Sequence, residues 1–315
     1  MRKLVLSVVL LLLCNHTNAQ IVYPGTNLPA DSPRLFAEGI ITDGLNNRDL
    51  AISPAGDELF FTLQQSRLSS TIIMLKKTNG SWGNPQVAPF SGRYRDLEAA
   101  FSPDGQTVFF ASDRPVNNSA KKDFDLWKVG RLASGEWGQP VHLGAEVNTA
   151  KNEFYPSVAK NGSLYFTVEA AYGKGKEDIV VCTAKPNGYN APVSLPEAIN
   201  STNYEFNAFV DPDEQYILFT GYGRADDMGG GDLYISRKDK AGNWQPAKHL
   251  PVNSAAIDYC PFVTPDKQYL VFTSARINKQ IADNSTKTYE VLKRLLSGAG
   301  NGSDDLYWVN FNKDW

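Results

Sequence analysis

Short apolar runs separated by a polar turn recur along the chain. In each copy an apolar strand ends at a Pro-Asp-Gly-like turn, and a second strand rich in Phe, Tyr, Val and Ile follows at once, which is typical of a β-hairpin. Pro supplies the fixed φ that such a turn needs, and Gly or a small polar residue accepts positive φ. The first turn residues, taken as reference positions, are Pro54, Pro103, Lys160, Pro212 and Pro265. The steps between them are 49, 57, 52 and 53 residues, so the chain contains a five-fold repeat.

Two more strands are expected in each copy. After a variable loop, the third strand begins with Asp and an apolar pair, as in DLW (125–127) and DLY (232–234), whereas the first copy has the weaker TIIML (71–75). A turn that places Gly or Asn beside Trp or Tyr then leads into a fourth strand. Four antiparallel strands in about fifty residues predict one blade of a β-propeller. The fold class is therefore all-β.

The two ends of the chain predict how the ring closes. The fifth copy stops after its third strand, LYWVNF (306–311). The segment PRLFAEGIITDGLNN (33–47) is similar to the pieces that hold the fourth strand and its linker in other copies. We expect a strand within residues 33–41 to complete the last blade, because this removes an open sheet edge. Five blades use every piece once.

The repeats resemble those of a known family. The elements FSPDG…FFASDR (101–114) and DLYW (305–308) are similar to the WD-like propeller repeats of TolB-type periplasmic proteins, and the resemblance covers the chain from about residue 30 to its end. It implies a propeller, and a partner-binding role or attachment to a peptidase, since the family's repeats occur in both settings. TolB-type rings usually have six blades, so six blades remain an alternative. No counterpart of the separate N-terminal domain of TolB is visible.

The first residues are typical of an export signal. Arg2 and Lys3 precede an apolar run over 4–13, and the segment 17–19 suits a signal peptidase, which predicts a signal peptide over residues 1–19. The run is too short to span a bilayer. Lipid attachment at Cys14 is the alternative, although the leucines before it lack the usual small residue. We therefore expect an exported, periplasmic or secreted protein that is not transmembrane.

The remaining residues divide into a lead over 20–32 and a single propeller over 33–315. The expected blades lie near 48–93, 95–150, 151–202, 203–256 and 257–315, the last completed by the closing strand 33–41. An insertion over 277–303 in the last blade contains Val291, Leu292, Leu295 and Leu296 at helical spacing. A start at Ser285 or Thr286 and a stop at Gly298 predict one short helix, which we expect to lie against the propeller.

Charge and cysteine content exclude several kinds of function. Without residues 1–19 the chain has 29 basic and 34 acidic side chains, a net charge near −5, which argues against a nucleic-acid partner. Cys182 and Cys260 have no metal-binding spacing, and we expect two buried thiols. No cofactor and no metal site are expected. The oligomeric state is left open, with a monomer as the default.

A recurring acid precedes four of the five hairpins, and Asn stands in its place in the first copy. Seven residues before the reference positions stand Asn47, Asp96, Glu153, Glu205 and Asp258, and Asp49 and Glu98 follow two residues later in the first two copies. If the first strands line a central channel, these carboxylates gather at its mouth as a cation or substrate site. The alternative is that each acid accepts backbone N–H bonds at its own strand entry.

Basic residues are expected on the same face. Arg114, Arg224 and Arg276 end second strands, and the loop 169–178 occupies the corresponding place in the third copy. Together with the acids they form the predicted ligand-binding set, on the face that carries the long loops and opposite the Pro-Asp-Gly turns. The alternative is that each arginine pairs with an acid of a neighbouring blade.

Three functions are compatible with these features. No G-x-S-x-G, H-E-x-x-H or phosphate loop is present, which favours a non-catalytic module that binds an envelope protein or a glycan. A glycan-cleaving hydrolase is the enzymatic alternative, with Glu98, Glu153 and Glu205 as candidate catalytic residues and Asp49 or Asp258 as a further carboxylate. A structural component of an envelope assembly is the third possibility.

Overall fold

The computed structural model describes residues 21–25, 28–117, 123–169 and 172–315. The expected signal peptide, its cleavage position and Cys14 lie outside these residues. In the described part, no helix is long and apolar enough to cross a membrane.

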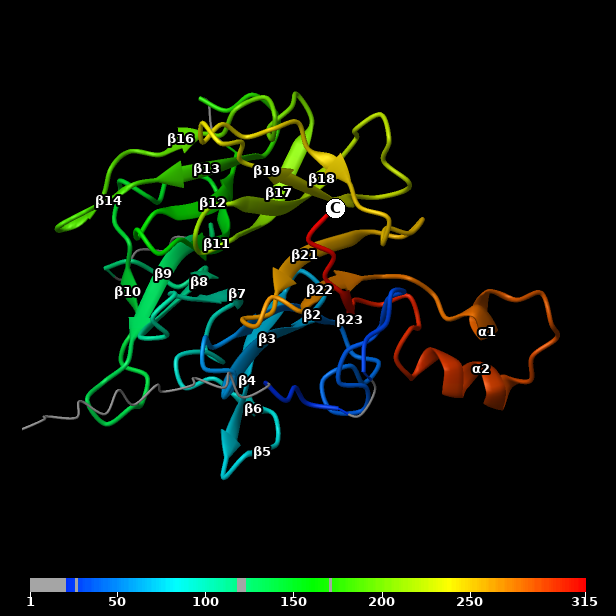
Figure 1. The fold of residues 1–315 in the computed structure, drawn as a ribbon. Coiled ribbons are helices and arrows are strands. Elements are labelled where there is room, and N and C mark those ends of the chain that lie inside the picture. Colours follow the sequence, from blue (N-terminus) through cyan, green and yellow to red (C-terminus); the bar gives the residue numbers. More distant parts are fainter. Residues whose placement is uncertain (1–20, 26–27, 118–122, 170–171) are drawn as a thin grey trace, which may run out of the picture.

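Five antiparallel sheets surround a central axis as the blades of a β-propeller (Figure 1). Blade 1 contains β2 (Asn47–Ile52), β3 (Glu58–Gln65), β4 (Ser69–Thr78), β5 (Ser81–Trp82) and β6 (Gln86–Val87). Blade 2 contains β7 (Asp96–Phe101), β8 (Thr107–Ser112), β9 (Asp125–Gly130) and β10 (Val141–His142). Blade 3 contains β11 (Glu153–Val158), β12 (Leu164–Val168), β13 (Asp178–Cys182) and β16 (Val193–Ser194). A small hairpin of β14 (Ala184–Lys185) and β15 (Gly188–Tyr189) extends from blade 3.

The last two blades confirm the predicted ring closure. Blade 4 contains β17 (Tyr204–Val210), β18 (Tyr216–Tyr222), β19 (Asp232–Arg237) and β20 (Lys248–His249). Blade 5 contains β21 (Asp258–Val263), β22 (Tyr269–Ser274), β23 (Asp305–Asn310) and the N-terminal β1 (Arg34–Leu35). β1 pairs antiparallel with β23, with Arg34 opposite Trp308 and Leu35 opposite Tyr307. The ring therefore has five blades and not six.

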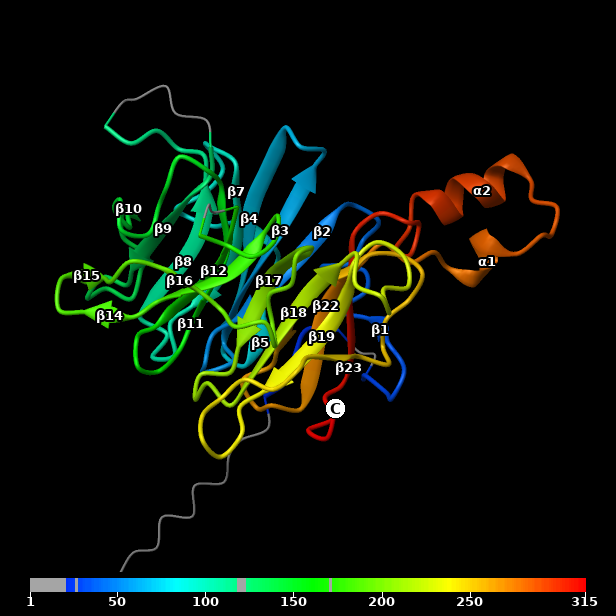
Figure 2. The same cartoon turned by 90° about the horizontal axis from the view of Figure 1, so that it is seen from above.

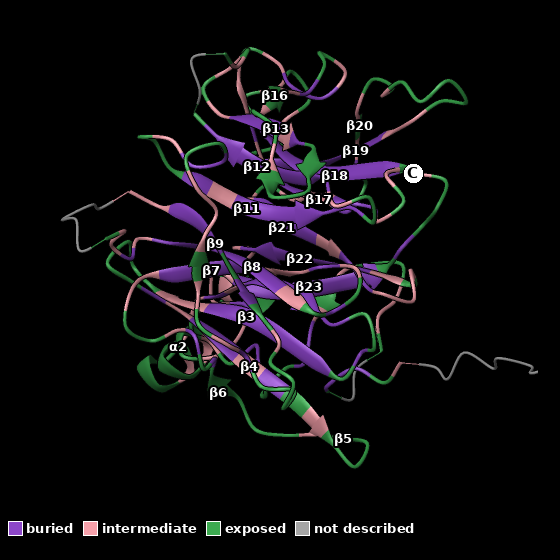
Figure 3. Ribbon diagram, turned by 90° about the vertical axis from the view of Figure 1, so that its left-hand side faces the viewer, coloured by how far each residue is buried: buried purple, intermediate pink, exposed green. Residues whose placement is uncertain are grey.

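Apolar side chains fill the space between blades. The second strand of each blade carries a buried phenylalanine at the same position. These residues are Phe61, Phe110, Phe166, Phe219 and Phe272. Third strands contribute rings that stack on them, as Tyr234 does on Phe219 and Tyr307 on Phe272. The first three strands of each blade are mainly buried or intermediate, whereas the short outer strands are largely exposed (Figure 3). The repeat is therefore held by packing between the inner parts of neighbouring blades.

The insertion in blade 5 differs from expectation. It forms two helices, α1 (Lys279–Ala282) and α2 (Tyr289–Leu296), where one was expected. The predicted start at Ser285 or Thr286 was wrong, because the Thr288 hydroxyl accepts from the Val291 N–H and caps α2 there. No residue of α2 is buried, and the pair projects away from the disc (Figure 2). The prediction that this helix lies against the propeller was wrong, because none of its side chains is buried and it packs against α1.

Candidate functional site

The first strand of every blade is interrupted at the same point. Each pairing of a first with a second strand shifts register there, as between Arg48 and Leu50 in blade 1. The residue at each shift has a φ between 42° and 60°. These residues, which we call the bulge ring, are Asp49, Glu98, Tyr155, Asn207 and Cys260. Each stands five residues before its reference position, so one β-bulge per blade places five different side chains at one level of the ring.

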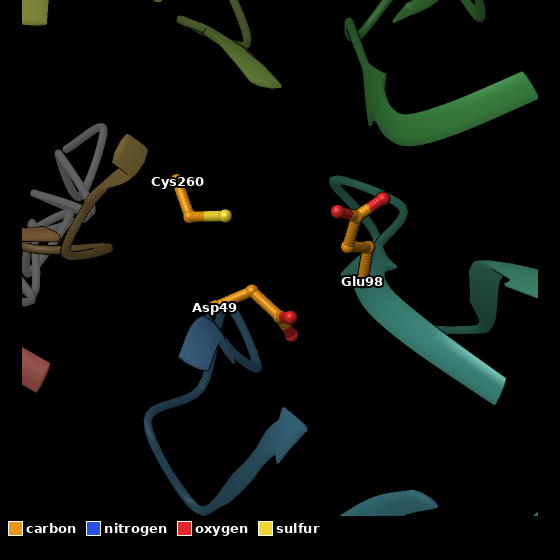
Figure 4. A group of neighbouring side chains, drawn as sticks. All are labelled: Asp49, Glu98 and Cys260. Carbon is orange, nitrogen blue, oxygen red and sulfur yellow. The ribbon is translucent and has the colours of Figure 1, made fainter. Parts of the chain in front are cut away.

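The bulge-ring side chains meet near the axis. Figure 4 shows Asp49, Glu98 and Cys260 pointing toward one another from three separate strands. One ligand atom of each lies within 4.8 Å of those of the other two. The Asn207 Nδ2 donates to Glu98 Oε1 at 3.2 Å, which joins blade 4 to blade 2 across the channel. All four side chains are buried.

A set of second-strand threonines fixes these bulges. The backbone N–H of Asp49 donates to Thr273 Oγ1 at 2.9 Å, and that of Glu98 donates to Thr62 Oγ1 at 3.2 Å. In both contacts the threonine of one blade accepts from the bulge residue of the next blade. Blade 2 has Ala111 in place of this threonine, so the bulge residue of blade 3, Tyr155, has no such partner. The Tyr155 N–H instead donates to Glu98 Oε2 at 2.8 Å. The missing hydroxyl in blade 2 is therefore replaced by the Glu98 carboxylate.

Arg48 is the cation of this cluster. Its Nη2 donates to Glu98 Oε1 and, at 3.3 Å, to Cys260 Sγ. Its Nε lies 3.3 Å from Asp49 Oδ2, and the guanidinium carbon lies 5.0 Å from the centre of the Tyr259 ring. The guanidinium thus contacts the three side chains that share a potential metal site. Because this positive charge already lies among them, the cluster fits a guanidinium better than a metal ion.

Burial shifts the protonation of these groups. It raises the pKa of Asp49 to about 8; the Arg48 charge opposes this shift and the Glu98 charge adds to it. Burial also raises the pKa of Glu98 and of the Cys260 thiol. At neutral pH Asp49 is therefore mainly protonated and Cys260 is a neutral thiol, which does not suit a nucleophile.

The recurring acids of the strand entries lie away from this cluster. Asp96, Glu153, Glu205 and Asp258 are fully buried. Each accepts hydrogen bonds from the link before its own strand, as Glu205 does from the Ser201 N–H and hydroxyl, both at 2.7 Å. Glu153, Glu205 and Asp258 thus accept the backbone N–H bonds of the strand-entry alternative, whereas Asp96 accepts from the Ser91 and Ser112 hydroxyls. Their binding of a ligand stays a prediction.

The three predicted arginines hold these acids in place. They are Arg114, Arg224 and Arg276, and they pair with Asp96, Glu205 and Asp258 respectively. The acid in each pair belongs to the arginine's own blade, not to a neighbouring blade as the structural alternative assumed. Each arginine also donates to a backbone carbonyl of the preceding link. A ligand role for these arginines likewise stays a prediction.

A cavity occupies the channel on the side of the Pro-Asp-Gly turns. Its volume is about 260 Å³, and residues of all five blades line it. Its walls are mainly apolar, with Ala100, Phe101, Phe209 and Phe262 among them, and two bulge-ring residues, Glu98 and Tyr155, border it. Lys160, Asp213 and Lys267 lie at the turn end. The predicted site was on the opposite face, so this cavity was not predicted from the sequence.

The signal for the cavity is present in the sequence. Phe209 and Phe262 stand three residues before their reference prolines, and Ala100 occupies the same place in blade 2. These side chains are only partly buried, although they belong to innermost strands. Large apolar residues at a position that faces a channel would have indicated an apolar lining. The position that faces the channel was not known, because the bulge changes the alternation of side chains.

The comparisons support the fold and not an activity. No protein-family model matches the sequence, and no curated protein matches it significantly. An α-L-arabinofuranosidase from Lactobacillus brevis is similar in structure, with a TM-score of 0.51 and 11% identity over 88% of this chain and 94% of that one. TolB from Acinetobacter baumannii has a TM-score of 0.47 and 11% identity, and the match covers 84% of this chain. The same match covers only 54% of that TolB. A periplasmic gluconolactonase from Pseudomonas aeruginosa has a TM-score of 0.41 and 12% identity over 84% of this chain and 88% of that one.

Proposed function

We propose that this propeller is a non-catalytic binding module of the cell envelope and that its channel cavity receives an apolar segment of a protein partner. The cavity carries the proposal. Apolar side chains from five blades enclose a volume of about 260 Å³, and a few polar groups border it at Glu98 and near the turns. A concave, mostly apolar site with few polar groups is the usual form of a binding pocket.

The lining favours a protein segment over a glycan. A sugar presents hydroxyl groups that need hydrogen-bond partners, and groups left unpaired after burial cost free energy. Phe, Pro, Ala and Val side chains form most of the wall. An apolar side chain of a partner would instead exchange water for contact with these rings.

Panning a phage-displayed random peptide library against the mature protein tests this proposal. We expect enriched peptides with apolar residues that bind the native protein and lose binding to Ala100→Trp, which fills the cavity. Tyr222→Ala is the matched control, because Tyr222 is 46% exposed at the end of β18 on the loop face. Peptides that bind Ala100→Trp normally and lose binding to Tyr222→Ala would contradict the proposed site.

A glycan-cleaving activity is the second candidate. Carboxylate oxygens of Asp49 and Glu98 lie within 4.8 Å of each other, which is near the spacing of about 5 Å found in retaining glycosidases. Both side chains are buried and ion-paired with Arg48, which leaves less room for a sugar ring. Turnover of p-nitrophenyl glycosides that disappears in Glu98→Gln would favour this candidate over the first.

Export is part of the proposal. The basic start, the apolar run and the Thr-Asn-Ala end of residues 1–19 support it, and they imply a mature chain that begins at Gln20. N-terminal sequencing of the protein recovered from the periplasm or the medium tests the cleavage position. A lipid-modified Cys14 at the N-terminus would replace this proposal with membrane anchoring.

A further inference from the structure

We propose that the channel binds a positively charged group, namely the ammonium end of an aliphatic chain such as a lysine side chain of the partner, with Glu98 as acceptor and Asp49 as the second carboxylate. This inference rests on the proposed function and names the chemistry of the ligand. It is carried by three features of the bulge ring: its two carboxyls beside one arginine, the open acceptor position of Glu98 and its place at one end of an apolar cavity.

The first feature is an excess of carboxylates. Asp49 and Glu98 both contact Arg48, and in the described part of the chain no other basic side chain lies within 4 Å of either. The remaining titratable groups that face Asp49 are Cys260 and Tyr155, which are neutral when protonated. If both carboxyls were ionised, one negative charge near the axis would have no counterion. Asp49 therefore stays mainly protonated at neutral pH, and a cationic ligand would supply the counterion that its ionised form lacks.

The second feature is unused acceptor capacity. An ionised carboxylate has about four acceptor positions. Glu98 uses three of them, for Arg48, for Asn207 and for the Tyr155 N–H. Asp49 Oδ2 and Arg48 Nε both lack a hydrogen bond and face each other as an ion pair at 3.3 Å, so Asp49 is not the open acceptor. The open position belongs to Glu98, which borders the cavity, and a donor that enters the cavity can reach it.

The third feature is the shape and polarity of the access route. The cavity runs from the turn side to Glu98 between apolar walls that include Phe101, Phe209 and Phe262. Methylene groups of a lysine side chain can pack on such walls while the charged end continues to a polar group. A hydrated divalent ion would gain nothing from these walls. The route therefore suits an alkylammonium group.

Binding of this group should release a proton. A second cation beside Asp49 stabilises its ionised form, and at neutral pH this carboxyl is mainly protonated because its pKa is raised to about 8. Arg48 lowers that pKa and Glu98 raises it, and both contacts are present before the ligand arrives. The apparent affinity for an alkylammonium ligand should therefore increase from pH 6 to pH 8.

Calorimetric titration with n-hexylamine and n-hexanol tests the inference. The two probes share an alkyl chain and differ in charge. We expect the amine to bind the native protein about tenfold more tightly than the alcohol, equivalent to about 1.4 kcal/mol. Glu98→Gln should reduce this preference to about twofold. Titration in buffers of different ionisation enthalpy should detect proton release with the native protein and none with Asp49→Asn.

The outcomes separate the inference from the proposed function. Equal affinity for both probes, with both lost in Ala100→Trp, would overturn the ammonium site and leave an apolar pocket. No binding of either probe would overturn both. If Glu98→Gln does not fold, the amine-to-alcohol ratio of the native protein and its pH dependence decide the question alone: a ratio near one that does not change with pH overturns the inference.

Discussion

At the scale of single residues, the bulge ring is the most distinctive feature of the chain. Five non-glycine residues adopt positive φ at equivalent positions, a conformation that costs free energy and persists only where surrounding contacts enforce it. Second-strand threonines supply some of those contacts, as Thr62 does for Glu98. The repeat therefore conserves the backbone of the channel and varies its side chains, which is how one motif builds an asymmetric polar cluster.

The threonine contacts predict a contrast between two similar substitutions. Thr62 Oγ1 accepts from the Glu98 N–H and donates to Asp49 Oδ1, so Thr62→Val should lower the free energy of unfolding by about 1–3 kcal/mol. Thr220 is equally buried but its hydroxyl has no hydrogen-bond partner. Thr220→Val should be neutral or stabilising. Urea denaturation of both variants checks this, and equal losses of stability would show that the hydroxyl contacts do not matter.

The Asp49 carboxyl predicts a dependence of stability on pH. Its pKa in the folded protein, about 8, is higher than its ordinary value of 3.8, so the folded state binds more protons than the unfolded state between these values. The free energy of unfolding should fall as pH rises, by at least about 1 kcal/mol between pH 6 and 8. Asp49→Asn should remove this part of the slope. Parallel slopes for the two proteins would contradict the raised pKa.

At the scale of elements, the hairpins follow from local chemistry and the inserted helices do not. A turn such as Ser102-Pro103-Asp104-Gly105 determines its own conformation, and the strands beside it need only the alternation of the sheet. The helix α2 was predicted from the spacing of its apolar residues, although its N-cap is Thr288 and not Ser285 or Thr286. Its contact surface was not, because an apolar helical face does not indicate which element covers it.

The exposed helix predicts tolerance to substitution. Leu296 is 53% exposed and Leu292 is 36% exposed, so Leu292→Ser and Leu296→Ser should each change the free energy of unfolding by less than about 0.5 kcal/mol. Leu306→Ser is the control, since Leu306 is fully buried in β23. Thermal denaturation compares the three variants. A large loss with Leu296→Ser would mean that α2 packs on the propeller after all.

The difference between local structure and the geometry of the closed ring also explains which parts of the candidate site could be predicted from the sequence. The acids of the strand entries recur in register with the repeat, and a local structural role could be proposed for them from that recurrence. Asp49 and Glu98 were also identified, as the acids that break the pattern. The contact of Arg48 with both, and the lining of the cavity, depend on how five bulges turn side chains toward a common axis. That arrangement is a property of the closed ring and not of any one repeat.

At the scale of the whole molecule, the short strand β1 joins the two ends of the chain. Phe36 follows it and packs at right angles on Trp308 of β23, with ring centres 5.1 Å apart. Tyr23 contacts the same tryptophan from the N-terminal lead. Closure therefore relies on aromatic packing as much as on the two backbone pairs of β1.

This closure predicts a large effect of one core residue. Phe36 is fully buried, and Phe36→Ala should lower the free energy of unfolding by about 3–5 kcal/mol. Ile40→Ala is the matched control, because Ile40 is 40% exposed and should lose far less. Chemical denaturation followed by tryptophan fluorescence measures both. Equal effects would imply that the ring does not depend on its closing segment.

An NMR titration of the isotopically labelled mature protein with n-hexanol would show directly which face of the propeller binds an apolar ligand. A ligand site in the turn-side cavity predicts the largest chemical-shift changes at Ala100, Phe209 and Phe262, which line it. Changes confined to the opposite face, for example at Tyr222 and the loop 226–231, would contradict the account. They would return the site to the long loops, where the sequence alone had placed it.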